Sequence, residues 1–141
     1  MSKLRNILLI DDDPATNFLH KIIIAKEDPS INVICKQSAK EALVYLKTKT
    51  EGEHPIPELI FLDINMPGMN GWDFLNEYQS IDETQQAKKV IVMLTTSLDP
   101  FDRKRAEDIK EISDFRSKPL TSIMLRKVLE FNFPETFQHY G

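Results

Sequence analysis

The sequence predicts an α/β fold: a doubly wound, five-stranded parallel sheet in the strand order 2-1-3-4-5, with helices on both faces. Two observations support this prediction. Short apolar runs such as Ile7–Ile10, Leu59–Leu62 and Val90–Leu94 are typical of strands buried on both faces. Stretches with helix start signals separate these runs, and parallel strands are joined by right-handed helical crossovers. The 141 residues are enough for one domain with its own core.

The first strand–helix unit begins with Ile7–Ile10, and its helix starts at Pro14. Asp13 supplies a side-chain acceptor at the helix N-cap, and the missing N–H of proline costs nothing at the first helical position. The helix is predicted to end before Asp28. Its apolar residues are Phe18, Leu19, Ile22 and Ile23.

The second unit starts with the strand Ile31–Cys35, in which Cys35 is interpreted as a buried, unreactive thiol. Ser38, with Glu41 three residues later, forms a capping box, and this box predicts a helix that extends through Leu46.

The third unit follows a polar loop and contains the strand Leu59–Leu62. A helix after Gly71 is expected, because its apolar residues recur at helical spacing. These residues are Trp72, Phe74, Leu75 and Tyr78. Residues 81–88 are expected to return the chain to the sheet.

The fourth unit contains the strand Val90–Leu94, and Asp99 followed by Pro100 repeats the cap-and-proline helix start. The helix Phe101–Lys110 is the most polar of the set, so we expect it to be loosely attached. Its basic run Arg103–Arg105 is interpreted as a solvated face. Its predicted inward residues are Phe101, Ala106 and Ile109.

The last unit consists of a short strand, Asp114–Ser117, and a helix capped by Thr121 or Ser122. The domain is predicted to span residues 1–132. Residues 133–141 then form a short aromatic C-terminal tail.

Polar side chains stand directly after the predicted strands. Asp11 and Asp12 follow the first strand, Asp63 follows the third, Thr95 ends the fourth, and Lys118 follows the fifth. In the 2-1-3-4-5 order, which is that of the flavodoxin-like fold, the first and third strands are neighbours at the switch point. Three carboxylates should therefore meet at one sheet edge, with a hydroxyl and an ammonium beside them.

This set of groups predicts phosphoryl chemistry. Three clustered carboxylates repel one another, so they must hold a cation or keep one carboxyl protonated. Mg²⁺ suits the all-oxygen donors, with Mn²⁺ as a substitute metal. Lys118 and Thr95 can neutralise and hydrogen-bond phosphoryl oxygens. Asp63 is thus predicted to attack phosphorus and to form an aspartyl phosphate.

Composition excludes several function classes. The net charge of −4 argues against direct DNA binding, because nucleic-acid-binding domains usually carry a basic face. No apolar stretch approaches the length of a signal peptide or a transmembrane helix, so no membrane insertion is expected and a cytoplasmic location is inferred. His20, His54 and His139 are not spaced as metal ligands.

The acidic pair after the first strand, the run from Asp63 to Gly71, Thr95 and Lys118-Pro119 together resemble the receiver domain of two-component response regulators. The resemblance covers roughly residues 4–131. It implies that Asp63 is the phosphoacceptor and that Asp11, Asp12, Asp63 and the backbone carbonyl of Asn65 bind the metal. It also implies a cis peptide between Lys118 and Pro119, and a switch made of Thr95 and Phe115.

The resemblance further implies the partners. A sensor histidine kinase or a histidine phosphotransfer protein would supply the phosphoryl group, and a downstream protein would respond to it. The face formed by the helix Phe101–Lys110, the strand Asp114–Ser117 and the last helix would switch, control that partner and support weak homodimerisation. Only residues 133–141 follow the last helix, so a stand-alone receiver without a DNA-binding output domain is expected.

Two alternatives belong to other function classes. A Mg²⁺-dependent phosphohydrolase would form the same aspartyl phosphate, but such enzymes commonly place an acid two residues after the nucleophile. Asn65 occupies that position and cannot transfer the proton, so a turnover enzyme is not expected. A flavodoxin-like binding module would share the topology, but the acids after the first strand would repel a flavin phosphate.

Overall fold

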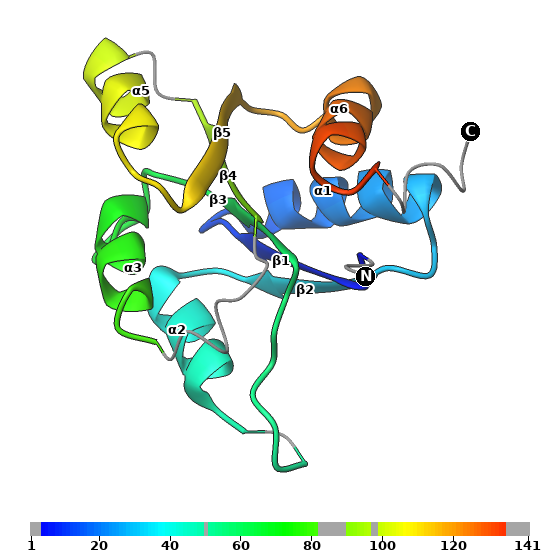
Figure 1. The fold of residues 1–141 in the computed structure, drawn as a ribbon, viewed down its shortest axis with the longest axis horizontal. Coiled ribbons are helices and arrows are strands. Elements are labelled where there is room, and N and C mark those ends of the chain that lie inside the picture. Colours follow the sequence, from blue (N-terminus) through cyan, green and yellow to red (C-terminus); the bar gives the residue numbers. More distant parts are fainter. Residues whose placement is uncertain (1–3, 50, 82–89, 97–98, 135–141) are drawn as a thin grey trace.

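The computed structural model of the chain describes residues 4–49, 51–81, 90–96 and 99–134. A five-stranded sheet forms its middle layer (Figure 1), and the strands pair in the order β2-β1-β3-β4-β5. All four pairings are parallel. The predicted fold class and strand order are therefore confirmed. The strands are β1 (Asn6–Ile10), β2 (Asn32–Lys36), β3 (Leu59–Leu62), β4 (Val90–Thr95) and β5 (Ile112–Ser117).

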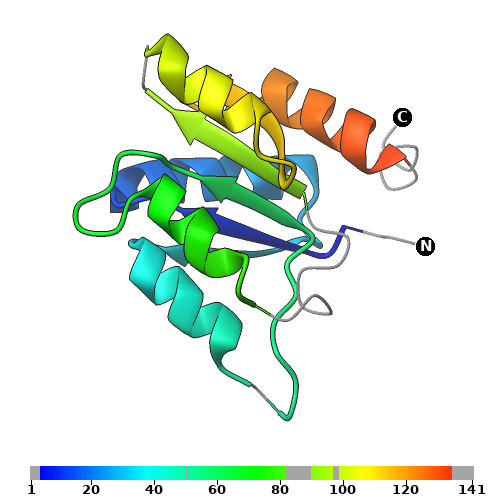
Figure 2. The ribbon, with the colours of Figure 1, turned by 60° about the vertical axis from the view of Figure 1, so that its left-hand side comes forward.

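Helices cover both faces of the sheet (Figures 1 and 2). The described helices are α1 (Pro14–Glu27), α2 (Ala39–Lys47), α3 (Gly71–Tyr78), α5 (Pro100–Glu107) and α6 (Ser122–Asn132). In both views α1 and α6 lie on one face, whereas α2, α3 and α5 lie on the other. This alternation is what right-handed crossovers in the observed strand order require.

The helices begin at residues whose side chains accept a hydrogen bond from the first helical turn. The Asp13 side chain accepts from the N–H of Ala15, and the Ser38 side chain accepts from the N–H of Glu41. At α6 the N-cap is Thr121 rather than Ser122. Such caps satisfy N–H groups that have no partner within the helix, so the sequence fixes these helix starts locally.

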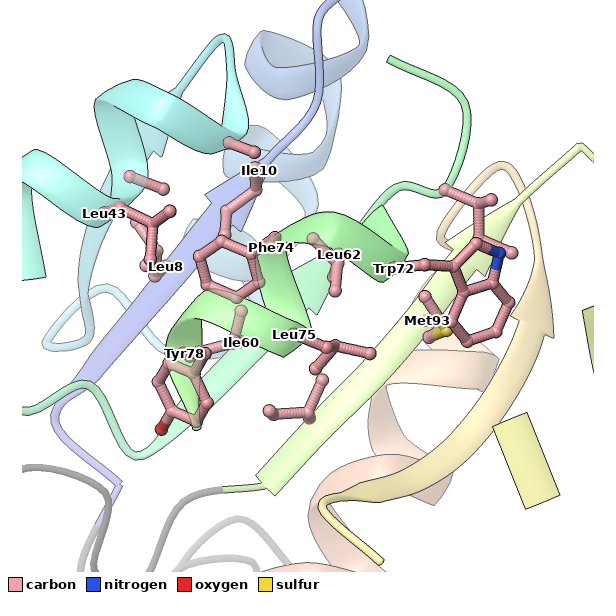
Figure 3. Packing of buried hydrophobic residues seen from close by; sticks show 14 of the residues in the cluster. Leu8, Ile10, Leu43, Ile60, Leu62, Trp72, Phe74, Leu75, Tyr78 and Met93 are labelled. Atoms are coloured by element: carbon pink, nitrogen blue, oxygen red, sulfur yellow. The ribbon is translucent and has the colours of Figure 1, made fainter. Parts of the chain in front are cut away.

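The core lies on both sides of the sheet. Ile7–Ile10 and Leu59–Leu62 are almost completely buried, as expected for central parallel strands. One buried cluster packs under α2, α3 and α5, and Figure 3 shows Phe74, Leu75 and Tyr78 of α3 lying over the strand residues of this face. A second cluster packs under α1 and α6.

The structure differs from the sequence prediction at α5. Phe101 is 78% exposed, whereas Ala106 is buried, so the predicted inward position of Phe101 is wrong. Five residues correspond to about 140° around a helix, and these two side chains therefore cannot both face the sheet. In addition, β5 begins at Ile112, two residues before its predicted start.

The predicted aromatic tail is described only in part. Phe133, its first residue, is buried in the cluster under α1 and α6. Residues 135–141 lie outside the described residues, as do residues 82–88 of the predicted return to the sheet. Within the described part of the chain, every helix is too short or too polar to cross a membrane.

Candidate functional site

The candidate site lies at the carboxyl ends of β1 and β3. Ile10 pairs with Leu62, and the N–H of Asp63 donates to the carbonyl oxygen of Ile10 at 3.0 Å. Asp11 and Asp63 therefore follow neighbouring strand ends, and both are about 5% exposed or less. Asp12, the next residue after Asp11, is exposed. The sheet thus brings together the three acids that the sequence singled out.

The three carboxylates are a suitable donor set for a hard divalent cation. One oxygen atom from each of Asp11, Asp12 and Asp63 lies within 4.8 Å of the others. Burial raises the pKa of Asp63 to about 6 and outweighs the opposite effect of Lys118, while Asp11 and Asp12 add smaller upward contributions. Ionisation of Asp63 thus costs more free energy in the metal-free protein than it does in water. A bound cation would relieve this cost, so the residues present fit Mg²⁺.

Lys118 forms ion pairs with two of the three acids. Its Nζ atom is 2.5 Å from Oδ2 of Asp11 and 3.3 Å from Oδ2 of Asp63. Burial lowers the pKa of Lys118, but the hydrogen bond and charge of Asp11, together with Asp63, outweigh this effect and raise it. The lysine is therefore a fixed positive charge beside Asp63. The peptide bond that joins Lys118 to Pro119 is cis.

Thr95 and Phe115 stand on the two strands next to the lysine. Thr95 is 1% exposed, and its carbonyl oxygen accepts a hydrogen bond from the N–H of Lys118 at 3.0 Å. Phe115 on β5 pairs with Met93 on β4, and its side chain is also buried. The guanidinium of Arg103 on α5 lies 5.0 Å from the centre of the Phe115 ring. The ring is therefore in contact with the surface helix.

The loop after β3 carries Asn65, which is exposed two residues beyond Asp63. Buried Met66 anchors this loop on one side. On the other, the N–H of Gly71 donates to the carbonyl oxygen of Ile64 at 2.9 Å. The loop is thus held against the end of β3, with its backbone near the acids.

Two site neighbours were missed by the sequence prediction. Asn17 and His20 on α1 are 3% and 2% exposed, and they line one small cavity together with Asp11 and Asp63. Residues 17, 20 and 24 lie on one face of a helix, and Ile24 is fully buried. The other apolar residues of α1 also recur at helical spacing, so spacing alone could not single out Asn17 and His20. The apolar residues Phe18, Leu19 and Ile22 are exposed instead.

Comparisons with known proteins agree with this geometry. A family model described as the response regulator receiver domain matches residues 7–130. The two-component response regulator ORR1 of rice, Oryza sativa subsp. japonica, is 25% identical over 118 residues. That match covers 82% of this chain but spans only half the length of the rice protein.

Solved structures of response regulators resemble this chain along nearly their whole length. A two-component response regulator from Cytophaga hutchinsonii is 31% identical with a TM-score of 0.83, and the match covers 94% of this chain and 99% of that one. A response regulator receiver protein from Dyadobacter fermentans is 26% identical with a TM-score of 0.79, covering 92% of this chain and 98% of that one.

Proposed function

This chain belongs to the response regulator receiver family of two-component systems, and on this premise we propose that Asp63 is its phosphoacceptor. The observation that carries the proposal is the position of the Asp63 carboxylate. It is buried at the end of β3, 3.3 Å from the ammonium of Lys118, and it forms one cluster with Asp11 and Asp12. A carboxylate among such charges can bind and attack a phosphoryl group.

The proposed reaction is an in-line transfer from a phosphohistidine of a sensor kinase or a histidine phosphotransfer protein. A carboxylate oxygen of Asp63 forms a bond to phosphorus while the phosphorus–nitrogen bond breaks. The electron pair of that bond returns to the imidazole, which takes up a proton from solvent. Lys118 stabilises the negative charge on the transferring oxygens, and the Thr95 hydroxyl donates a hydrogen bond to one of them.

Asp11, Asp12 and Asp63, with the backbone carbonyl of Asn65, would hold Mg²⁺ or, as a substitute, Mn²⁺. The ion would supply positive charge that neutralises the carboxylates and the phosphoryl oxygens. Asn65 stands two residues after Asp63, where an acid could otherwise assist hydrolysis. We therefore assign a signalling role rather than turnover of a metabolite.

The proposed response is a shift between two conformations that already exist. Phosphorylation would draw Thr95 toward the new phosphoryl group, and Phe115 would follow. The Phe115 ring is already buried here, so the second conformation in this proposal is one with the ring turned outward. Because Arg103 of α5 contacts that ring, the movement would reach the surface.

The surface formed by α5, β5 and α6 would then bind a downstream protein, and it would also support weak homodimerisation. Direct DNA binding is not part of the proposal, because the chain is acidic, with a net charge of −4. A pathway of this kind would operate in the cytoplasm.

The first test is intact-mass measurement after incubation with phosphoramidate and Mg²⁺. Wild type is expected to gain one labile phosphoryl group that requires Mg²⁺. Asp63→Asn should gain none, whereas Asp108→Asn, an exposed acid at the end of α5, should behave as wild type. Phosphate release without an adduct would instead support the phosphohydrolase. If neither an adduct nor phosphate release is observed, the binding module would be the remaining interpretation.

The second test concerns the switch and uses Trp72, the only tryptophan of the chain. Phosphoramidate with Mg²⁺ should change its emission in wild type, because Arg105 of α5 lies over its ring. Thr95→Ala should still gain the phosphoryl group but lose most of the emission change. An unchanged emission response in Thr95→Ala would remove Thr95 from the coupling.

A further inference from the structure

The helix α1 buries two polar side chains and exposes several apolar ones. Phe18 is 67% exposed, whereas Asn17 and His20 are 3% and 2% exposed. Burying a polar side chain costs free energy unless it forms hydrogen bonds, so this arrangement is unfavourable for a helix that merely covers a sheet. The partners of the two buried side chains therefore indicate what the inward face of α1 does.

Asn17 holds the acidic side of the site. Its Nδ2 atom donates to the carbonyl oxygen of Asp11 at 3.0 Å and to that of Lys36 at 3.3 Å. The N–H of Asp11 in turn donates to the same Lys36 carbonyl oxygen at 3.1 Å. Asn17 thus fixes the backbone that carries the Asp11 carboxylate.

His20, one helical turn later, holds the lysine side. Its Nε2 atom accepts a hydrogen bond from the N–H of Leu120 at 3.1 Å. Leu120 follows Pro119, which has no N–H, and Pro119 follows Lys118. The N–H of Lys118 is bound to the carbonyl oxygen of Thr95 at 3.0 Å. The segment from Lys118 to Leu120 is therefore held at its first N–H by β4 and at its last by His20.

This segment determines where the Lys118 ammonium can reach. A lysine side chain is long and flexible, so the position of its backbone sets the region that the Nζ atom can reach. Nζ lies 2.5 Å from Asp11, whose backbone Asn17 holds. Two residues of one helix thus fix both members of this ion pair, Asn17 through Asp11 and His20 through the segment after Lys118.

We propose that His20 is a positioning residue for Lys118, and that with Asn17 it makes α1 a brace across the phosphorylation site. This inference rests on the proposed function, because Lys118 must act on the phosphoryl group. His20 accepts through Nε2, so the neutral ring carries its proton on Nδ1. Burial lowers the pKa of His20 and outweighs the opposite effect of Asp11, which keeps this acceptor available near neutral pH.

The test compares three variants of His20 by their rates of phosphorylation with phosphoramidate and Mg²⁺. This small donor needs no docking of a kinase on α1. His20→Met fills the space with an apolar side chain and removes the ring acceptor. His20→Asn is shorter, so its amide oxygen is withdrawn from the N–H of Leu120. His20→Gln can still present an oxygen to the N–H of Leu120. A displacement of 1 Å in a catalytic group can cost about 100-fold in rate, so losses of at least roughly fivefold are expected for Met and Asn.

His20→Gln should recover most of the wild-type rate even if its melting temperature falls as much as that of the other variants. A Lys118→Met background supplies the second control, because His20 acts through the lysine. There, adding His20→Met should change the residual rate less than twofold. Wild-type rates in His20→Met and His20→Asn, equal losses in all three variants, or the same fold loss without Lys118 would each overturn the inference. Failure of wild type to form the adduct would instead count against the proposed function.

Discussion

Gly71 approaches Asp63 so closely that a Cβ atom on Gly71 would lie 2.5 Å from the backbone carbonyl oxygen of Asp63. The same atom would lie 3.0 Å from the Cα atom of Ile64. Both contacts are with backbone, which cannot rotate away as a flexible side chain could. The first residue of α3 is therefore packed directly against the residue that we propose as the phosphoacceptor.

Gly71→Ala should displace the backbone of Asp63 and so impair the site as well as the fold. We expect a loss of unfolding free energy of about 1–3 kcal/mol, the usual cost of overpacking, measured by urea denaturation. We also expect phosphorylation by phosphoramidate to slow by roughly tenfold or more, because the nucleophile moves relative to Lys118.

Gly68→Ala is the matched control. Gly68 has a φ of +74°, but nothing lies within 4 Å of a Cβ atom built on it. The substitution should cost about 1–2 kcal/mol of backbone strain without displacing Asp63. Its phosphorylation rate should stay near that of wild type. Equal loss of rate in both variants would mean that the loop conformation, not the Gly71 contact, positions Asp63.

Mg²⁺ should raise the melting temperature, because it binds the folded acid cluster and the unfolded chain lacks that cluster. At a concentration 100 times the dissociation constant, the stabilisation is about 2.7 kcal/mol. Asp12→Ala should reduce this gain strongly at little cost to the metal-free fold, because Asp12 is exposed. Differential scanning calorimetry with and without Mg²⁺ measures both. The same gain in both proteins would exclude Asp12 from the metal site.

Asp63→Asn should stabilise the metal-free protein at neutral pH. The pKa of Asp63 is raised to about 6 in the folded state, above its ordinary value of 3.8, so the folded protein loses stability from this group as pH rises through 6. Asparagine does not ionise, and the variant should therefore be more stable at pH 7 by roughly 1–3 kcal/mol. Urea denaturation should show the advantage disappearing toward pH 4. An advantage that is independent of pH would assign it to another cause.

The sequence predicts those features of the site that follow from local signals and from topology. Asp11 and Asp63 end apolar strands, and strand order alone makes them neighbours. The face of α1 was not predicted, because apolar residues normally turn inward and Asn17 and His20 would then be solvated. The hydrogen bond that justifies burying His20 comes from Leu120, 100 residues later in the chain. No local pattern contains that partner.

The basic run of α5 is exposed, as the sequence predicts, but two of its arginines also contact aromatic rings. Arg103 and Arg105 are exposed, yet their guanidinium groups lie over the rings of Phe115 and Trp72. This helix buries only Ala106. Cation–π contacts therefore add to its attachment, and they join it to β5 by one arginine and to α3 by the other.

Arg105→Gln tests this attachment through the single tryptophan. The guanidinium lies 4.5 Å from the centre of the Trp72 ring, so its removal should change the tryptophan emission spectrum. It should also cost about 0.5–1 kcal/mol of unfolding free energy at this partly exposed site. Lys104→Gln, which removes the same charge from the same helix, is the control and should leave the emission unchanged. If the two variants shift the spectrum equally, net charge rather than the contact between Arg105 and Trp72 sets the emission, and that contact does not attach α5 to α3.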